Sequence, residues 1–300
     1  MGRIIRCITS DGTVSVMACD STDITARAKS IHNTTNVCTA ALGRVLTAAS
    51  MIGSMQKDDE DSITIRFAGG GPAGMVTAVA KGTGNVKGDI DNPDADVPKR
   101  ADGHLNVGGV IGRDGTMVVI KDMGLAKPYI GQIPITTGEI AEDITSYYAV
   151  SEQTPTVCGL GVLVAPTGEV IVSGGFLIQL LPTADDSIID RVEADIQNLR
   201  PVTAMLSDGL TLEEICKSLL PSFEIEPLWE LHPQYKCECS REKTMNMLLT
   251  LGKKELGKMA FDSTTEVVCH FCGTKYRFTS EEILRLQSLC DENKNQNKGE

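Results

Sequence analysis

The sequence lacks the features that mark membrane, secreted and nucleic-acid-binding proteins. No run reaches the roughly 18 uncharged apolar residues of a membrane-spanning helix, which argues against a membrane partner. The first residues, MGRIIRCITSDG, contain neither the apolar stretch nor the small-residue cleavage site of a secretion signal. Basic residues are in deficit: 28 Lys and Arg stand against 40 Asp and Glu, and the net charge is −12. Phosphate backbones repel so acidic a chain, and we expect a cytoplasmic protein that does not bind nucleic acid.

Familiar catalytic arrangements are also missing. His32, His104 and His232 have no partner at the spacing of a Ser-His-Asp or metalloprotease motif, and we expect the protein not to be an enzyme. The glycines of GGGPAG, residues 69–74, do match the dinucleotide-binding pattern G-x-G-x-x-G. That pattern requires a turn that opens a helix, whereas β-rich MVTAVA follows here and Pro72 interrupts the turn. We interpret GGGPAG as a glycine-rich link between two strands.

Residues 1–182 combine strand-like and helix-like patterns. Three apolar runs are each divided by a tight-turn signal, which predicts a β-hairpin. These signals are Asp11-Gly12, Asp114-Gly115 and the turn from Pro166 to Gly168. Between them, residues 39–55 and 136–150 carry apolar side chains at helical spacing. The sequence therefore predicts an α+β protein with an N-terminal core of mixed sheet and helix.

Residues 183–236, called the linker below, have a different character. Their first apolar residues fall on one face of a predicted helix that stops at Pro201. Those residues are Ile189, Val192, Ile196 and Leu199. A capping box from Thr211 to Glu214 opens a second helix. Eleven acidic and four basic side chains give the linker a net charge of −7, and we expect a helical segment that packs on a neighbour.

A short C-terminal unit follows over 237–290. Helical patterns at its two ends flank TEVVCHFCGTKYRF, which indicates strand, knuckle and strand. A unit of about 55 residues has a marginal core and usually needs a metal or a disulfide to fold. The polar tail 291–300, DENKNQNKGE, is typical of a disordered segment.

Four of the ten cysteines form two close pairs in that unit. Cys237 and Cys239 are separated by one residue, and Cys269 and Cys272 by two. Two such pairs predict a tetrahedral zinc site of four thiolates, one ion per chain. His270 lies inside the second pair as a competing ligand, and we expect it to point outward.

The single residue between Cys237 and Cys239 leaves a further reading open. A disulfide there would close a small, restricted ring, and strain makes such a bond easier to reduce. The pair could therefore hold metal when reduced and form a labile disulfide when oxidised. The other six cysteines are scattered along the chain, at Cys7, Cys19, Cys38, Cys158, Cys216 and Cys290. We expect most of the first five of these to be small buried apolar residues.

Over residues 3 to 290 the chain resembles the heat shock protein 33 family of redox-regulated holdase chaperones from the bacterial cytosol. The resemblance rests on TAALGRVLTAASMIG, GGGPAGMVTAVA, GGFLIQLLP, the run from VGGVIGRDG to SEQTPT and, above all, CECSREK…LLTLGKKEL…EVVCHFCGTKYRF. It implies an N-terminal core that binds clients and dimerises, a redox-responsive linker and a zinc-binding switch domain. The chain departs from the family in carrying extra thiols such as Cys38, where Ala is expected. Those thiols leave open whether only two bridges form.

The resemblance also implies a cycle that needs no ATP. In the reduced, inactive form the four paired cysteines bind zinc. Oxidation converts them to Cys237–Cys239 and Cys269–Cys272 disulfides, zinc leaves, and the active form dimerises. The acidic linker should then open, because short isolated helices are marginal in water. Opening would expose the helical face from Ile189 to Leu199, and the core surface beneath it, to unfolding client proteins.

Two other classes remain open. A zinc-ribbon factor for nucleic acid or the ribosome would need a basic surface, but residues 237–290 carry eight basic and seven acidic side chains, and a zinc with four thiolates adds −2. A protein dithiol oxidoreductase would place its cysteine pair at a strand-to-helix turn, whereas Cys269 and Cys272 are expected between strands.

Overall fold

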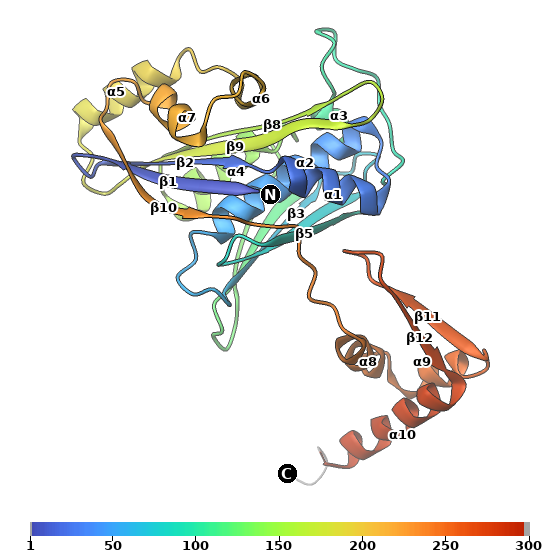
Figure 1. Ribbon diagram of the computed structural model, residues 1–300. Coiled ribbons are helices and arrows are strands. Elements are labelled where there is room, and N and C mark those ends of the chain that lie inside the picture. Colours follow the sequence, from blue (N-terminus) through green and yellow to red (C-terminus); the bar gives the residue numbers. More distant parts are fainter. Residues whose placement is uncertain (1, 297–300) are drawn as a thin grey trace. The chain divides into compact units, whose positions relative to one another are not determined.

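The computed structural model describes residues 2–296, with side chains described over 2–290 (Figure 1). The chain divides into two compact units, and the division falls between Lys236 and Cys237. Antiparallel sheets and helices occur together, which confirms the predicted α+β class. None of the helices in the described part of the chain is both long and apolar enough to cross a bilayer.

The first sheet of the N-terminal unit has the strand order β10-β1-β2-β9-β8, with every neighbouring pair antiparallel. Two of the predicted hairpins are confirmed here, since β1 and β2 flank Asp11-Gly12, and β8 and β9 flank the Pro166–Gly168 turn. The strands are β1 (Arg3–Thr9), β2 (Val14–Asp20), β8 (Thr156–Val164), β9 (Val170–Leu180) and β10 (Ile225–Leu231).

The second sheet has the order β5-β4-β3-β6-β7 and is also antiparallel. GGGPAG joins β3 to β4, as expected of a link between strands. The strands are β3 (Ser62–Ala68), β4 (Met75–Lys81), β5 (Val86–Ile90), β6 (Thr116–Asp122) and β7 (Tyr129–Pro134).

The predicted hairpin around Asp114-Gly115 is wrong, because its first arm is the short helix α3 (Val107–Ile111). The Asn106 side chain caps α3 by accepting a hydrogen bond from the Gly109 amide. The end of α3 lies directly against the glycine link, where the Gly71 amide donates to the Ile111 carbonyl at 2.9 Å. A Cβ at Gly71 would lie 2.4 Å from the Val110 carbonyl oxygen. The glycines therefore allow close backbone packing, which explains them without a nucleotide.

Helix α2 (Asn36–Gly53) packs against strands of both sheets (Figure 1). Every residue of α2 except Asn36 and Arg44 is buried, as expected of a helix that is apolar on all sides. It corresponds to the predicted helix over 39–55. The predicted helix over 136–150 is shorter, as α4 (Ala141–Tyr147) followed by a single π turn, η1 (Tyr148–Glu152). Helix α1 (Thr22–His32) packs on α2.

Nearly half of the linker is helical, and its helices α5, α6 and α7 cover the outer face of the first sheet (Figure 1). They are α5 (Asp186–Ile196), α6 (Val202–Ser207) and α7 (Leu212–Leu219), and α7 begins with the predicted capping box. The end of the linker corrects the helical prediction: β10 pairs with β1 at the sheet edge. Pro227 has no amide hydrogen to donate, which suits an edge strand, and the pairing shifts register opposite it.

The apolar face predicted for the linker packs on this sheet. Val192 is buried, and Ile196 and Leu199 are half-buried against the same cluster. Ile189 is half-buried and lines a recess of about 250 Å³ together with Val192 and Ile196. Ile188, which the sequence analysis did not select, is 9% exposed and belongs to the cluster.

The C-terminal unit is built from one hairpin and three helices among the described residues. They are α8 (Arg241–Thr250), α9 (Gly252–Met259), β11 (Thr264–Val268), β12 (Lys275–Thr279) and α10 (Ser280–Gln296). Its core is small and consists of Leu248, Leu256, Phe278, Ile283 and Leu286, with partly buried neighbours. Helix α10 is assigned as far as Gln296, and residues 297–300 lie outside the described residues. The disorder expected of the tail 291–300 stays a prediction.

Candidate metal centre

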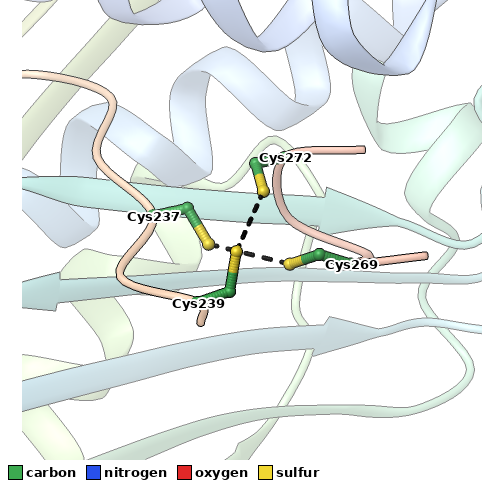
Figure 2. Close-up of side chains that lie close together, drawn as sticks. All are labelled: Cys237, Cys239, Cys269 and Cys272. Carbon is green, nitrogen blue, oxygen red and sulfur yellow. Dashed lines mark hydrogen bonds between the residues drawn. The ribbon is translucent and has the colours of Figure 1, made fainter. Parts of the chain in front are cut away.

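Two separate segments bring four thiols together. Cys237 and Cys239 lie in the extended segment before α8, and Cys269 and Cys272 lie in the turn between β11 and β12 (Figure 2). All four Sγ atoms lie within 4.8 Å of one another. The predicted cysteines therefore converge on one point.

Local structure explains why each pair is held in place. In the hairpin turn, the Cys269 amide donates to the Thr274 carbonyl and the Gly273 amide donates to the Cys269 carbonyl, both at 2.9 Å. Gly273 has φ of +70°, a conformation that costs glycine least. In the other segment, the Ser240 side chain caps α8 by accepting from the Lys243 amide at 3.1 Å. Cys239 is thus fixed directly before a helix start.

The sulfur spacing fits a metal ion bound by four thiolates. The Sγ atoms of Cys237 and Cys269 are 3.7 Å apart, and those of Cys239 and Cys272 are 3.3 Å apart. A regular tetrahedron with Zn–S bonds of ~2.3 Å has sulfur–sulfur edges of ~3.8 Å. A disulfide bond is far shorter, at ~2.05 Å, so these are four free thiols.

The surroundings of the sulfurs are uneven. Burial raises the pKa of the Cys237 and Cys269 thiols, which disfavours their thiolate forms. Burial acts on Cys272 in the same direction, but hydrogen bonds with Thr274, Cys239 and Cys269 together outweigh it and bring its pKa to about 7. Metal ligation requires all four thiolates, and a divalent cation would favour them by offsetting two of their four negative charges.

Two hydroxyl groups beside the sulfurs were not predicted. The Tyr276 hydroxyl donates to Cys239 Sγ at 3.1 Å, and this hydrogen bond raises the pKa of Tyr276 to about 12. The Thr274 hydroxyl lies 3.1 Å from Cys272 Sγ. Both residues follow Cys272 within four positions, so their closeness to the knuckle was the available signal. Contacts of this kind orient metal ligands.

His270, the competing ligand, is exposed and does not belong to the four-residue group. The four cysteines lie in a hairpin turn and before a helix, which differs from the strand-to-helix turn expected of a dithiol oxidoreductase. The scattered cysteines are mostly buried, as predicted. Cys7, Cys19, Cys38 and Cys216 are buried, whereas Cys158 and Cys290 are half-buried.

Comparisons with known proteins agree on one family. A family model described as "Hsp33 protein" matches residues 2–279. A 33 kDa chaperonin of Clostridium novyi is 43% identical over 285 residues, which cover 95% of this chain and 97% of that protein. A 33 kDa chaperonin of Clostridium beijerinckii is 42% identical over the same lengths. The crystal structure of a 33 kDa chaperonin (heat shock protein 33 homolog) from Thermotoga maritima matches with a TM-score of 0.87 at 32% identity, over 96% of this chain and 98% of that chain.

Proposed function

This chain belongs to the Hsp33 family, and from that premise we propose that it is a holdase chaperone switched on by oxidation. It binds unfolding proteins without ATP and keeps them from aggregating. The observation that carries the proposal is the convergence of four thiols within 4.8 Å in a unit with a small core. The chaperonin names of its relatives support the same class of function.

In the reduced protein, the four sulfurs hold two distant segments of the C-terminal unit together. Zn²⁺, when bound, keeps the four cysteines as thiolates and contributes roughly 10–16 kcal/mol of apparent binding free energy to the folding of the unit. Five core side chains offer little stability by themselves in a unit of this size. The cysteines therefore decide whether the C-terminal unit is folded.

Oxidation removes this set of ligands. As the resemblance to the family implies, Cys237 joins Cys239 and Cys269 joins Cys272, so that each bond lies within one segment. Each new S–S bond releases two electrons, which a hydroperoxide accepts. Two thiolates, one hydrogen peroxide and two protons give one disulfide and two water molecules. The two segments are then no longer connected to each other, and the unit unfolds.

Unfolding can pass along the chain to the linker. Residues 234–236 are hydrogen-bonded to β5, since the Lys236 amide donates to the Val86 carbonyl at 2.8 Å and the Val86 amide donates to Gln234 at 3.0 Å. Cys237 follows these residues directly, and β10 precedes them. Strand β10 lies at a sheet edge and is largely exposed. Loss of an ordered Cys237 loosens the end of this segment, and the acidic linker opens from there.

The open form offers apolar surface from two sources. One is the inner face of the linker helices, including Ile188, Val192 and Ile196. The other is the outer face of the first sheet, where a fully buried large apolar side chain contributes roughly 1.5–3 kcal/mol when covered. The sheet residues are Ile5, Cys7, Val14, Val16, Ala18, Phe176 and Ile178. Unfolding proteins expose similar surface and bind it. The active form dimerises, and the protein works in the bacterial cytoplasm.

The proposal is tested by the aggregation of a thermally unfolding reporter protein, measured with reduced and with peroxide-treated chain. Zinc release is followed in parallel with a chromogenic chelator. We expect suppression of aggregation only after oxidation and in step with zinc release. Equal suppression by the reduced, metal-loaded protein would contradict the proposal.

A further inference from the structure

One recess of the N-terminal unit, with a volume of about 200 Å³, combines positive charge with an apolar wall. Asn36 and Arg44 of α2 line it together with Lys99 and His104, which lie between β5 and α3. None of the described acidic side chains lines it. Its apolar wall is formed by Ala40, Leu105, Val162, Leu163, Val164 and Pro166. Such a site is unexpected in a chain with a net charge of −12, and we call it the cationic recess.

Helix α2 supplies one side of the cationic recess. The helix is buried everywhere except at Asn36 and Arg44, and both of these residues line the recess. Ala40 also lines it, so that the three residues follow one side of the helix at intervals of four. The first turn of α2 contains no acidic residue, and the helix dipole adds partial positive charge near Asn36. The two partly exposed residues of an otherwise buried helix thus open into the same recess.

Hydrogen bonds around the start of α2 hold the other sides in place. The Asn36 side-chain amide donates to the Ala165 carbonyl in the turn after β8, at 3.4 Å. The Thr35 amide donates to the Pro93 carbonyl at 2.9 Å, and the Thr35 hydroxyl donates to the Ala95 carbonyl at 2.6 Å. These contacts connect α2 to both segments that face it. The recess is therefore formed without a ligand, as is usual for small-molecule sites.

The guanidinium group of Arg44 is only partly compensated. Its Nη1 donates to Glu139 Oε2 at 2.7 Å. Glu139 Oε1 accepts from the Gly108 amide at 3.1 Å and lies 3.5 Å from Arg100 Nη1, so one carboxylate serves two guanidinium groups. Arg44 Nε is buried and has no acceptor within the described part of the chain, which is rare for a buried donor.

The neighbouring charges leave a positive balance. Asp102 lies 3.4 Å from Arg100 Nη2 and 3.1 Å from His104 Nδ1. Lys99 is exposed, and its ammonium group has no ion-pair partner among the residues that the structure describes. Among these groups, three cationic side chains face the two carboxylates of Glu139 and Asp102. One positive charge remains even when His104 is neutral.

We propose that the cationic recess binds a small organic monocarboxylate, with its carboxylate beside Arg44 and Lys99 and its apolar part against Leu105 and β8. One surplus positive charge matches a monoanion better than a phosphate dianion, and a carboxylate forms charge-assisted hydrogen bonds with both cationic side chains. The apolar wall favours an acid that carries a hydrocarbon group over a bare ion. The site lies wholly within the N-terminal unit and goes beyond the proposed thiol switch.

The class of ligand is tested by titrating the full-length, zinc-loaded protein with N-acetyl-leucine at low ionic strength, followed by saturation-transfer NMR of the probe. Three controls each lack one feature: N-acetyl-leucinamide has no charge, acetate has no apolar group, and inorganic phosphate is mainly a dianion. We expect each to bind at least roughly fivefold more weakly, because charge and apolar contact both contribute. Absence of N-acetyl-leucine binding at millimolar concentrations, or equal binding of any control, would overturn the proposal.

Variants test the place of binding. Lys99→Gln removes an exposed charge and should raise the Kd for N-acetyl-leucine at least about threefold. Leu163→Asp puts a negative charge on the 41% exposed wall residue and should raise it roughly tenfold or more. Lys57→Gln, which changes an exposed lysine outside the recess, should bind as wild type does. An unchanged Kd in both Lys99→Gln and Leu163→Asp would place the ligand elsewhere and overturn the assignment.

Discussion

Arg3 on β1 holds the carboxylate of Glu213 on α7 with two nitrogen atoms, at distances of 2.9 and 2.5 Å. The same guanidinium also donates to Glu230 on β10 at 2.6 Å. One side chain thus connects the sheet to a linker helix and to the strand that precedes the C-terminal unit. This arrangement gives a physical link between β10 and the docking of α7.

Replacement of Glu213 by Gln should loosen α7. The Arg3–Glu213 ion pair is bidentate but partly exposed, so its loss should cost about 1 kcal/mol or less. This corresponds to at most a roughly fivefold rise in the fraction of molecules with α7 detached. Hydrogen exchange of α7 in the reduced, zinc-loaded protein measures this change. Glu193→Gln on α5, also an exposed linker carboxylate, is the control. Equal exchange in the two variants would show that the ion pair with Arg3 does not help to hold α7 on the sheet.

Mild acid should loosen the contact around Tyr235. His32 Nε2 lies 3.2 Å from the Tyr235 hydroxyl, and burial lowers the pKa of His32 even though Asp89 opposes this effect. His32 therefore binds a proton more readily in the unfolded chain than in the folded one. The contribution of neutral His32 to the stability of the fold is complete above a pH of about 6.5 and falls as the pH drops below that value.

The measurement is hydrogen exchange over 225–236 at pH 7.5 and 5.5, corrected for intrinsic rates. Protection in wild type should fall a few-fold with acid, whereas His32→Gln, which does not titrate, should show little change. A wild-type response no larger than that of the variant would show that protonation of His32 does not matter.

Zinc should depend on each of the four clustered cysteines. Cys239→Ser and Cys269→Ser remove one sulfur from each segment, and both should retain less than stoichiometric zinc after gel filtration. Cys290→Ser changes a half-buried thiol of the same unit outside the cluster and should keep its metal. Elemental analysis gives the metal content. Stoichiometric zinc in either of the first two variants would contradict the four-thiolate site.

The buried cysteines should resist labelling while the protein is folded. A small maleimide should modify Cys7, Cys19, Cys38 and Cys216 at least ~100-fold more slowly in native protein than in denaturant, because reaction requires local opening. The Cys38 sulfur, which is enclosed and donates to the Ala95 carbonyl at 3.2 Å, is the most informative position. Fast native labelling there would indicate a redox role for Cys38.

The sequence could predict the metal centre because its geometry is local. Each cysteine pair is held within one short segment, and Gly273 indicates in the sequence that the knuckle between β11 and β12 is a turn. The helical face with Val192 was also predictable, since apolar spacing along one helix needs no knowledge of the partner.

Features that depend on distant partners were not predictable. Strand β10 contains Pro227 and follows three helices, so its own residues do not indicate a strand. It forms because it pairs with β1, which lies more than 200 residues earlier in the sequence. Helix α3 is a five-residue apolar run, which is too short for its periodicity to distinguish a helix from a strand. Its packing against Gly71 determines that it forms a helix.

Oxidation of the metal-centre thiols should open the linker and so create the client-binding surface. Hydrogen exchange of the rapidly oxidised, zinc-free protein, taken alongside its holdase activity, tests this most directly. We expect loss of protection over 183–290 as activity appears, while residues 2–180 stay largely protected. Activity that appears while α5, α6 and α7 remain protected would contradict it, because clients would then bind a surface that is already exposed.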